Sequence, residues 1–373
     1  MTNLVYIISS ISKSVAFEWI CEELDKSKYK LTFILLNETE TPIENYLIKN
    51  NITCYRVKYV TKKDLLFAIF KIRSILKKEK TDIVHAHLFE GSFIGLIAAK
   101  LAGVKRRIHT RHNATIHHNY FPHAVKYDKF INYLSTDIIA ISDNVKSIII
   151  NKEGVSENKI SIIHHGFKLN EFSNVERKRV EEIRRKHLPN TEGKIIFGVI
   201  SRYIHWKGIQ FIIPAFNKFV ASNSNAHLVI CNATGPYQKE IQLLLNELPK
   251  DSYSEIKFEE DVFALYQNFN FFIHTPIDEE SEAFGQVYVE ALASSIPSIV
   301  TLSGIAPEFM AHKKNAWIVS FCNSEEIYQG MLELSSNQNL IQEITAQGLI
   351  DVHQLFPLNQ MISSLEKLYE RSN

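Results

Sequence analysis

The sequence predicts an α/β protein of two doubly wound domains that face each other across a cleft. Three observations predict this fold class. The chain has 373 residues, which is too long for one ordinary hydrophobic core and about right for two domains. Short β-branched runs alternate with helical patterns in the first half, and a second such series starts near residue 194. Alternation of this kind is typical of parallel sheets covered by helices.

The first series contains seven apolar runs, each short enough for a buried strand. They lie at 4–9, 31–36, 52–57, 83–85, 107–109, 138–141 and 159–163. The segments between them carry apolar residues at helical spacing. They predict helices at 15–25, 43–50, 61–79, 91–102, 123–134 and 143–152.

A polar, densely charged stretch at 168–194 predicts a linker followed by a surface helix. The second series then predicts strands at 194–199, 227–231, 255–258, 271–274 and 298–300. Its helices are predicted at 209–221, 239–247, 261–267 and 285–294. The tail 358–369 is amphipathic and predicts a last helix. We therefore place a first domain at 1–172, a second at 173–355 and a C-terminal helix at 356–373.

Composition excludes several classes of protein. Hydrophobic residues make up 45% and charged residues 22% of the chain, as in globular proteins, and no apolar stretch approaches the ~18 residues that a spanning helix needs. The N-terminus reads as a first strand and not as a signal peptide, because it lacks a basic region and a cleavage site. The four cysteines have no metal-ligand spacing, which predicts a reduced, cytoplasmic protein without a zinc site.

The net charge of +1 hides an asymmetry. Residues 1–172 hold 25 Lys and Arg against 17 Asp and Glu, a formal charge of +8, and the remainder carries −7. A basic half suggests that the first domain meets an anionic surface, either nucleic acid or a membrane. The cations gather at 62–80 and 105–107, near the aromatic pair Tyr120-Phe121. Because no nucleic-acid-binding module is recognisable, we favour a weak peripheral membrane contact, with the apolar stripe of 61–79 packed on the sheet.

Two carboxylates, Glu282 and Glu290, flank Gly285 where a predicted strand passes into a helix. A helix start exposes unpaired N–H groups and a partial positive charge, so it can receive a phosphate. Carboxylates would repel that phosphate. We therefore expect them to accept hydrogen bonds from hydroxyls on either side of it, as on the two sugars of a nucleotide-sugar.

Two cations, Arg202 and Lys207, follow the first strand of the second domain. Ligands of open α/β sheets bind outside the carboxyl ends of the strands. A guanidinium fork and a mobile ammonium together suit a diphosphate. The alternative is a pair of solvated surface cations.

With these motifs in place, the chain resembles the family 4 retaining glycosyltransferases, also called glycosyltransferase group 1, which have the GT-B fold. The matching segments occur in the family's order. They are 81–87, 108–113, 137–142, 159–167, Arg202 to Gly208, Gly235-Pro236 and Glu282 to Glu290. The resemblance implies two Rossmann-like domains, the first binding an acceptor and the second a nucleotide-sugar, and a C-terminal helix that crosses back to the first domain.

The resemblance also implies a role for each site residue. Glu282 holds the donor-sugar hydroxyls with help from the backbone N–H groups of Phe284 and Gly285, and Glu290 holds the ribose. Arg202 and Lys207 neutralise the departing diphosphate, and Gly235 lies in a donor-binding loop. His112 contacts the donor sugar. The reaction is expected to be metal-independent, with front-face attack and no protein general base.

This sequence departs from the family pattern in three places. The first loop, 9–14, has no glycine where the family often has two. Ser201 stands before Arg202 where the family has glycine. Gly304 and Glu308 are one residue further apart than in the family motif, so they are weaker donor-site candidates.

The histidines between 109 and 123 invite a metal-site interpretation, because imidazole is a good metal ligand. They are His109, His112, His117, His118 and His123. Because no carboxylate or cysteine lies at matching spacing, we expect no bound metal.

The predicted substrate is a UDP- or GDP-linked sugar, with no other cofactor. The predicted acceptor is a glycan or a lipid-linked intermediate at the inner face of the cell membrane, in cell-surface polysaccharide synthesis. Three alternatives stay open: a nucleotide-sugar 2-epimerase of similar fold, a glycoside hydrolase with two carboxylates, and a catalytically silent sugar-binding relative.

Overall fold

A computed structural model describes residues 1–371 and divides the chain into two compact units. Unit 1 comprises residues 1–167 and the chain from Leu358 onward, and unit 2 comprises Lys168–Pro357. The borders predicted from the sequence were at 172 and 355. Residues 372–373, the end of the predicted segment 356–373, lie outside the described residues.

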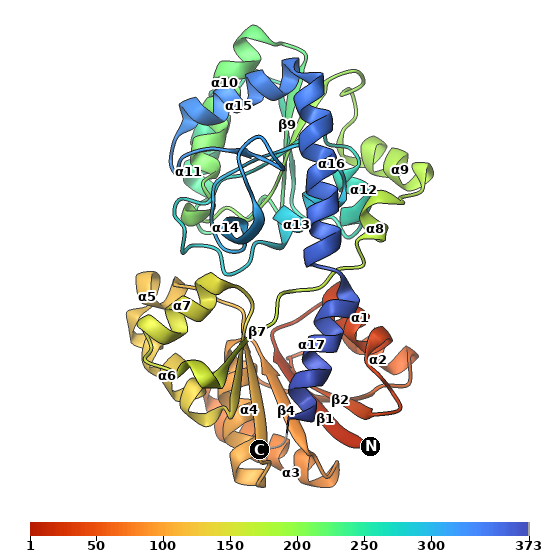
Figure 1. The fold of residues 1–373 in the computed structure, drawn as a ribbon, viewed down its shortest axis with the longest axis vertical. Helices are drawn as coiled ribbons and strands as arrows, with labels where there is room; N and C mark the ends of the chain where they lie inside the picture. The colour runs from red at the N-terminus through yellow and green to blue at the C-terminus, as the bar shows by residue number, and fades with distance from the viewer. Residues whose placement is uncertain (372–373) are drawn as a thin grey trace. The chain divides into compact units, whose positions relative to one another are not determined.

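Unit 1 contains a seven-stranded parallel sheet of order β3-β2-β1-β4-β5-β6-β7 (Figure 1). Its strands are β1 (Thr2–Ser9), β2 (Tyr29–Leu36), β3 (Thr53–Val57), β4 (Ile83–His87), β5 (Arg106–Arg111), β6 (Asp137–Ala140) and β7 (Ile160–Ile162). Its helices are α1 (Val15–Glu23), α2 (Pro42–Lys49), α3 (Leu65–Lys78), α4 (Phe89–Ala102), α5 (Ile116–Tyr120), α6 (Val125–Leu134), α7 (Asp143–Asn151) and α17 (Leu358–Glu370).

Alternation along the central strands sends side chains to opposite faces of this sheet. Ile7 and Val84 belong to a buried core that they share with residues of α3, α4 and α6. Tyr6 and His85 point instead to α17, where both contact the Tyr369 hydroxyl, at 2.6 Å for the Tyr6 hydroxyl and 2.7 Å for His85 Nδ1. The last helix of the chain therefore packs on the first sheet, as the sequence predicted.

The C-terminal end of α17 is capped by a buried arginine from β5. The Arg106 guanidinium donates hydrogen bonds to the carbonyl oxygens of Leu368 at 2.5 Å and Tyr369 at 2.6 Å. A cation at this position also complements the helix dipole.

Unit 2 contains a six-stranded parallel sheet of order β10-β9-β8-β11-β12-β13. Its strands are β8 (Ile195–Ile200), β9 (Ala226–Cys231), β10 (Tyr253–Ile256), β11 (Phe271–His274), β12 (Ser298–Val300) and β13 (Trp317–Ile318). Its helices are α8 (Asn170–Ser173), α9 (Arg177–His187), α10 (Ile209–Ser222), α11 (Gln238–Leu245), α12 (Val262–Tyr266), α13 (Gln286–Ala293), α14 (Ala306–Phe309), α15 (Ser324–Ser336) and α16 (Gln338–Leu355).

The structure differs from the predicted elements in a few places. The predicted helix 61–79 is divided into a 3-10 turn, η1 (Lys62–Asp64), and α3. The Thr61 hydroxyl and the Asp64 carboxylate form a reciprocal capping box there, which sets where the helix begins. The short helices α5 and α14, the helices α15 and α16, and strand β13 were not predicted. Among residues 1–371, no helix combines the length and the hydropathy needed to cross a membrane.

Candidate active site

The predicted donor-site residues of unit 2 lie on loops at one edge of its sheet. Strands β8, β11 and β12 are adjacent and parallel. The loops that follow them carry Arg202 and Lys207, then Glu282, then Gly304. The sheet topology therefore gathers segments separated by about a hundred residues, as expected at the carboxyl ends of parallel strands.

Glu282 is at the centre of this cluster and is only 7% exposed. Its Oε1 forms an ion pair with the Lys207 ammonium and lies 3.1 Å from His274 Nε2. Its backbone N–H donates to the Ser303 hydroxyl at 3.1 Å. Burial by itself would raise the pKa of Glu282, but Lys207 and the His274 hydrogen bond outweigh burial and hold that pKa far below its usual range. Glu282 is therefore a permanently ionised hydrogen-bond acceptor.

His274 fixes the carboxylate from the end of β11. It is 1% exposed, its pKa is lowered by burial, and its Nδ1 has no hydrogen-bond partner. The ring packs edge-on against Tyr288, with centroids 4.8 Å apart. A neutral imidazole beside a carboxylate must carry its proton on the nitrogen that faces it. His274 Nε2–H therefore donates to Glu282.

Gly235 is required by the packing of two loops. The Tyr203 N–H donates to Thr234 O at 2.9 Å, and the Tyr237 N–H donates to Tyr203 O at 3.0 Å. A Cβ on Gly235 would lie 2.2 Å from that Tyr203 oxygen. Gly235 thus supports the segment that carries Arg202, whose side chain is exposed. The structure gives Gly235 this packing role.

The start of α13 is built from the two other predicted backbone positions. Gly285 precedes the helix at φ +83°, in the left-handed region that favours glycine. Phe284 is buried, its ring packs against Phe356, and its carbonyl accepts the Ile305 N–H at 2.9 Å. A Cβ on Gly304 would lie 2.7 Å from both Glu282 Cβ and the Phe284 carbonyl oxygen. Only glycine allows this loop to approach the helix start so closely.

Glu290 lies one turn into α13 and has different partners from Glu282. It is half-buried and accepts a hydrogen bond from the Tyr266 hydroxyl at 2.9 Å. Burial raises the pKa of Glu290 to about 7, although the Tyr266 hydrogen bond opposes the rise. The two glutamates of the motif therefore differ in charge state near neutral pH.

His112 belongs to unit 1 and directly follows β5. Its Nε2 lies 3.1 Å from His87 Nδ1, and its ring stacks on His165 with centroids 5.6 Å apart. Burial lowers the pKa of His112 to about 4. His112 is therefore a neutral imidazole near pH 7, able to offer a hydrogen bond without a charge.

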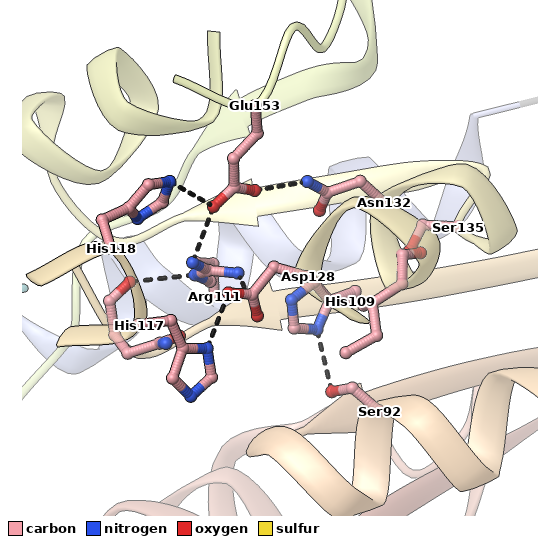
Figure 2. Close-up of polar contacts among 11 residues, drawn as sticks. Ser92, His109, Arg111, His117, His118, Asp128, Asn132, Ser135 and Glu153 are labelled. Atoms are coloured by element: carbon pink, nitrogen blue, oxygen red, sulfur yellow. Dashed lines mark hydrogen bonds and ion pairs between the residues drawn. The ribbon is translucent and has the colours of Figure 1, made fainter. Parts of the chain in front are cut away.

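A buried polar network holds the end of β5 just before His112 (Figure 2). Arg111 is 1% exposed and forms ion pairs of 2.8 Å with both Asp128 and Glu153. His117 Nδ1 lies 2.6 Å from Asp128, and the Asn132 amide donates to Glu153 at 2.6 Å. The network fixes the backbone from which His112 extends.

Two further histidines considered as metal ligands lie beside other polar side chains. His109 is buried with Nδ1 2.9 Å from the Ser92 hydroxyl, and His118 Nε2 lies 3.8 Å from Glu153, too far for a hydrogen bond. Within residues 1–371, no group of three or more His, Cys, Asp or Glu side chains is arranged to hold a metal ion.

The structure thus brings Lys207, Glu282 and Gly304 into contact or close approach, and places Gly235 against the loop of Arg202. Glu290 pairs separately with Tyr266, and His112 lies in the other unit. Sequence reasoning missed the residues that orient these groups, which are His274, Ser303, Tyr266, Arg111, Asp128 and Glu153. A signal existed only for His274, because a polar residue ends an otherwise apolar strand immediately before the binding loop.

Comparison with known proteins covers most of the chain. The family model described as "Glycosyl transferases group 1" matches residues 180–349, and that of "Glycosyltransferase Family 4" matches residues 18–171. The capsular polysaccharide biosynthesis glycosyltransferase CapM of Staphylococcus aureus is 26% identical over 314 residues, covering 82% of this chain and 80% of CapM.

Two further proteins show the range of similarity. An Escherichia coli UDP-Gal:α-D-GlcNAc-diphosphoundecaprenol α-1,3-galactosyltransferase is 26% identical over 174 residues, which cover 46% of this chain and 44% of that enzyme. The crystal structure of Anabaena HepE in complex with UDP and glucose superposes with a TM-score of 0.85 over the whole of both chains, at 16% identity. This last similarity shows the GT-B fold, with its two parallel sheets.

Proposed function

We propose a function for this protein on the premise that the chain belongs to the group 1 glycosyltransferases of family 4, with the GT-B fold. It is a glycosyltransferase, and the finer activity is our proposal. We propose that it transfers a hexose from a UDP- or GDP-linked donor to a glycan or lipid-linked acceptor, with retention at the anomeric carbon, in cell-surface polysaccharide synthesis.

The arrangement of Lys207, Glu282 and His274 carries this proposal. Glu282 is ionised, and Lys207 and His274 hold its Oε1, so the carboxylate is fixed in position as an acceptor for sugar hydroxyls. A carboxylate with so low a pKa does not serve as a general acid, so a glycoside hydrolase would need Glu290 in that role. Release of free sugar from the donor without an acceptor would identify that alternative.

Two cations, Arg202 and Lys207, and the N-terminus of α13 are assigned to bind the leaving diphosphate. Lys207 is paired with Glu282 in the structure, and Arg202 is exposed. We propose that an arriving diphosphate attracts both cations and the helix N-terminus, so that Lys207 bridges the phosphate and Glu282. Hydrogen-bond donors and cations that are already in place when negative charge develops in the transition state account for a large part of the rate enhancement of many enzymes.

Relatives support the class of substrate. CapM is named for capsular polysaccharide biosynthesis, and the E. coli relative for transfer to a sugar carried by diphosphoundecaprenol. HepE was solved with UDP and glucose. By analogy, we propose unit 1 for the acceptor, unit 2 for the donor, and a site of action at the cytoplasmic face of the membrane.

A panel of UDP- and GDP-sugars, each with and without added glycan and lipid-linked acceptors, tests the proposal. We expect transfer to one acceptor, with the α-linked donor giving an α-linked product by NMR. A 2-epimer formed without acceptor would instead identify the epimerase alternative. Nucleotide-sugar binding without turnover would identify a silent relative.

Transfer is expected to persist in excess EDTA, because Lys207, Arg202 and the start of α13 are assigned to the charge of the diphosphate. The control is a metal-dependent glycosyltransferase inactivated in the same buffer. Loss of transfer on chelation, with recovery on adding manganese or magnesium, would contradict the metal-independent proposal.

A further inference from the structure

Exposed apolar side chains are concentrated on one face of unit 1. Seventeen large hydrophobic residues are exposed among the described residues, and ten of them lie on α3, α4, α6, the end of α5 and the turns that lead into α3 and α6. We call this surface the α3–α4–α6 face. Its ten residues are Val60, Leu66, Phe67, Phe70, Leu101, Tyr120, Phe121, Tyr127, Phe130 and Tyr133.

Helix α3 is apolar on two sides. Ala68 and Ile72 are fully buried in the core, which accounts for the stripe that the sequence predicted to pack on the sheet. Leu66, Phe67 and Phe70 form a second stripe and are 67%, 62% and 59% exposed. The fold does not use this second stripe.

The three helices form one continuous surface. The Arg73 guanidinium on α3 donates to the Leu101 carbonyl at the end of α4, at 3.0 Å. The Lys100 ammonium on α4 lies 5.0 Å from the ring centroid of Tyr133 on α6. The Phe93 ring on α4 lies 5.9 Å from the Phe130 ring on α6. In Figure 1 these helices belong to the orange and yellow part of the ribbon.

The face is also basic. Exposed lysines lie among the apolar side chains, namely Lys62, Lys63, Lys71, Lys77, Lys100, Lys126 and Lys129. Only four carboxylates lie in the same segments. Glu79 pairs with Lys30 and Asp128 with Arg111, whereas Asp64 caps η1 and Glu90 accepts from Ser9, so these last two keep their charge. The exposed lysines outnumber these two carboxylates, and the face is therefore net positive.

One part of the basic surface expected from the sequence is absent from this face. Arg106 is buried and caps α17. The Arg107 guanidinium donates to the carbonyl oxygens of Val104 and Leu134, at 2.7 and 2.8 Å. The segment 105–107 was therefore wrongly included among the lipid-facing cations, because two of its three side chains are used to cap and join elements.

We infer that the α3–α4–α6 face docks on an anionic lipid bilayer. Aromatic side chains with polar tips favour the headgroup region, and lysines among them are attracted to lipid phosphates. A second copy of the chain is a poorer occupant, because self-association would bring lysines against lysines. The inference rests on the proposed function and deepens it. A unit 1 that is docked on the bilayer would lie next to a lipid-linked acceptor held in the same membrane.

Flotation with vesicles tests this inference on the full chain. The vesicles contain phosphatidylcholine alone or phosphatidylcholine with phosphatidylglycerol. We expect binding only to the anionic vesicles, and release by salt because the attraction is screened. The variant Leu66→Ser/Phe67→Ser should lower the partition coefficient at least about tenfold, as expected for losing two inserted apolar side chains.

The matched control is Leu243→Ser/Phe258→Ser in unit 2. Leu243 and Phe258 are 69% and 63% exposed, nearly the same as Leu66 and Phe67, but lie outside the face. This variant should bind vesicles like the unaltered protein. Equal loss in both variants, or no vesicle binding at all, would overturn the inference. So would sedimentation showing a dimer that Leu66→Ser/Phe67→Ser dissociates, with no vesicle binding.

The same proteins are assayed for transfer to a water-soluble acceptor. Transfer should be unchanged in Leu66→Ser/Phe67→Ser, because the face contains no residue assigned to the reaction. Vesicle binding without any transfer would reject the proposed function and support the docking surface. Transfer without vesicle binding would support the proposed function and reject the docking surface.

Discussion

The ion pair between Lys207 and Glu282 joins two residues that are both assigned to the donor. Removing only one partner leaves the other buried and uncompensated, so each single variant mixes a loss of stability with a loss of function. Lys207→Met and Glu282→Gln must therefore be compared with their double variant, so that the loss of stability can be separated from the loss of function.

We expect each single variant to lower the unfolding free energy by about 1–3 kcal/mol, and the double variant by less than the sum. All three should lower kcat by at least about a hundredfold, as expected for losing a prepositioned charge. Urea unfolding and initial rates provide the two measurements. A double variant that regained activity along with stability would contradict the catalytic assignment of the pair.

His274 is proposed as a positioning residue that acts through Glu282. His274→Gln keeps a donor near the position of Nε2, whereas His274→Phe keeps only the ring shape. We expect the Phe variant to lose about tenfold or more in kcat with little change in the Kd for UDP, and the Gln variant to recover most of that loss.

The control for His274 is His227→Phe. His227 is another buried histidine of the second sheet, in β9, with Nε2 2.8 Å from the Ser254 hydroxyl. Its loss should lower stability without a specific effect on kcat. Similar kinetic profiles for the two Phe variants would reduce His274 to a purely structural role.

Glu290 should make UDP binding depend on pH. The pKa of Glu290 is raised to about 7 in the folded protein by burial, above its unfolded value of ~4.3. The folded state therefore binds more protons between these values, and the contribution of Glu290 to stability falls as pH rises through this window. Ribose hydroxyls donate hydrogen bonds, so they favour the ionised carboxylate.

We expect UDP to bind more weakly at about pH 6 than at about pH 8, by up to roughly tenfold, with proton release near pH 7. Calorimetric titration in two buffers of different ionisation enthalpy measures that release. Glu290→Gln should abolish the pH dependence while leaving an oxygen acceptor for the ribose. Unchanged proton release in this variant would place the titrating group elsewhere.

At the scale of elements, the Arg111 network holds the end of β5 in addition to its backbone pairing with β4 and β6. Two buried carboxylates share one guanidinium, and burial raises the pKa of Glu153, opposed by Arg111. Arg111→Met should cost about 3–5 kcal/mol of unfolding free energy, because it leaves both carboxylates uncompensated. It should also lower transfer, because His112 follows directly.

Glu153→Gln is the matched variant, because it keeps the shape and one acceptor oxygen but removes the negative charge and one of the two hydrogen bonds, from Arg111 or Asn132, that Glu153 accepts. We expect it to cost about 1–3 kcal/mol, less than Arg111→Met. Urea unfolding at neutral pH compares the two. Equal losses would show that the network needs both carboxylates ionised.

The elements that the sequence predicted well are those with one dominant signal. The β-branched runs of the central strands and the amphipathic face of α17 each bury a continuous apolar stripe, so periodicity identifies them. The short helix α5 was missed because it has no buried residue and is held by His117 and its ion pair with Asp128. The second apolar stripe of α3 was not predicted, because composition alone does not distinguish a helix with one buried and one exposed apolar stripe from a fully buried helix.

At the scale of the whole molecule, the sequence predicted the residues that we assign to the donor but not the groups that hold them. Glu282, Lys207 and Gly285 stand in a recognisable local motif, so they could be found without coordinates. His274 contacts Glu282 from the end of β11 and Ser303 from the loop after β12, and only the sheet order brings these segments together. The burial of Glu282 could not be foreseen from local spacing.

The chain path makes unit 1 depend on residues that follow unit 2 in the sequence. Its core is completed by α17, in which Leu365 is 5% and Leu368 1% exposed. Each unit has its own apolar core, so we expect two calorimetric unfolding transitions. UDP should raise only the transition of unit 2, because a ligand stabilises the state that binds it.

Leu365→Ala and Leu368→Ala should each cost about 2–5 kcal/mol and lower only the transition that UDP does not shift. Leu334→Ala in α15, at a site with 0% exposure, is the matched control in unit 2. It should lower the transition that UDP raises. If all three variants lowered the same transition, the two units would unfold together and α17 would couple them. Separate shifts would instead show that the last helix stabilises the first domain without contributing to the donor site.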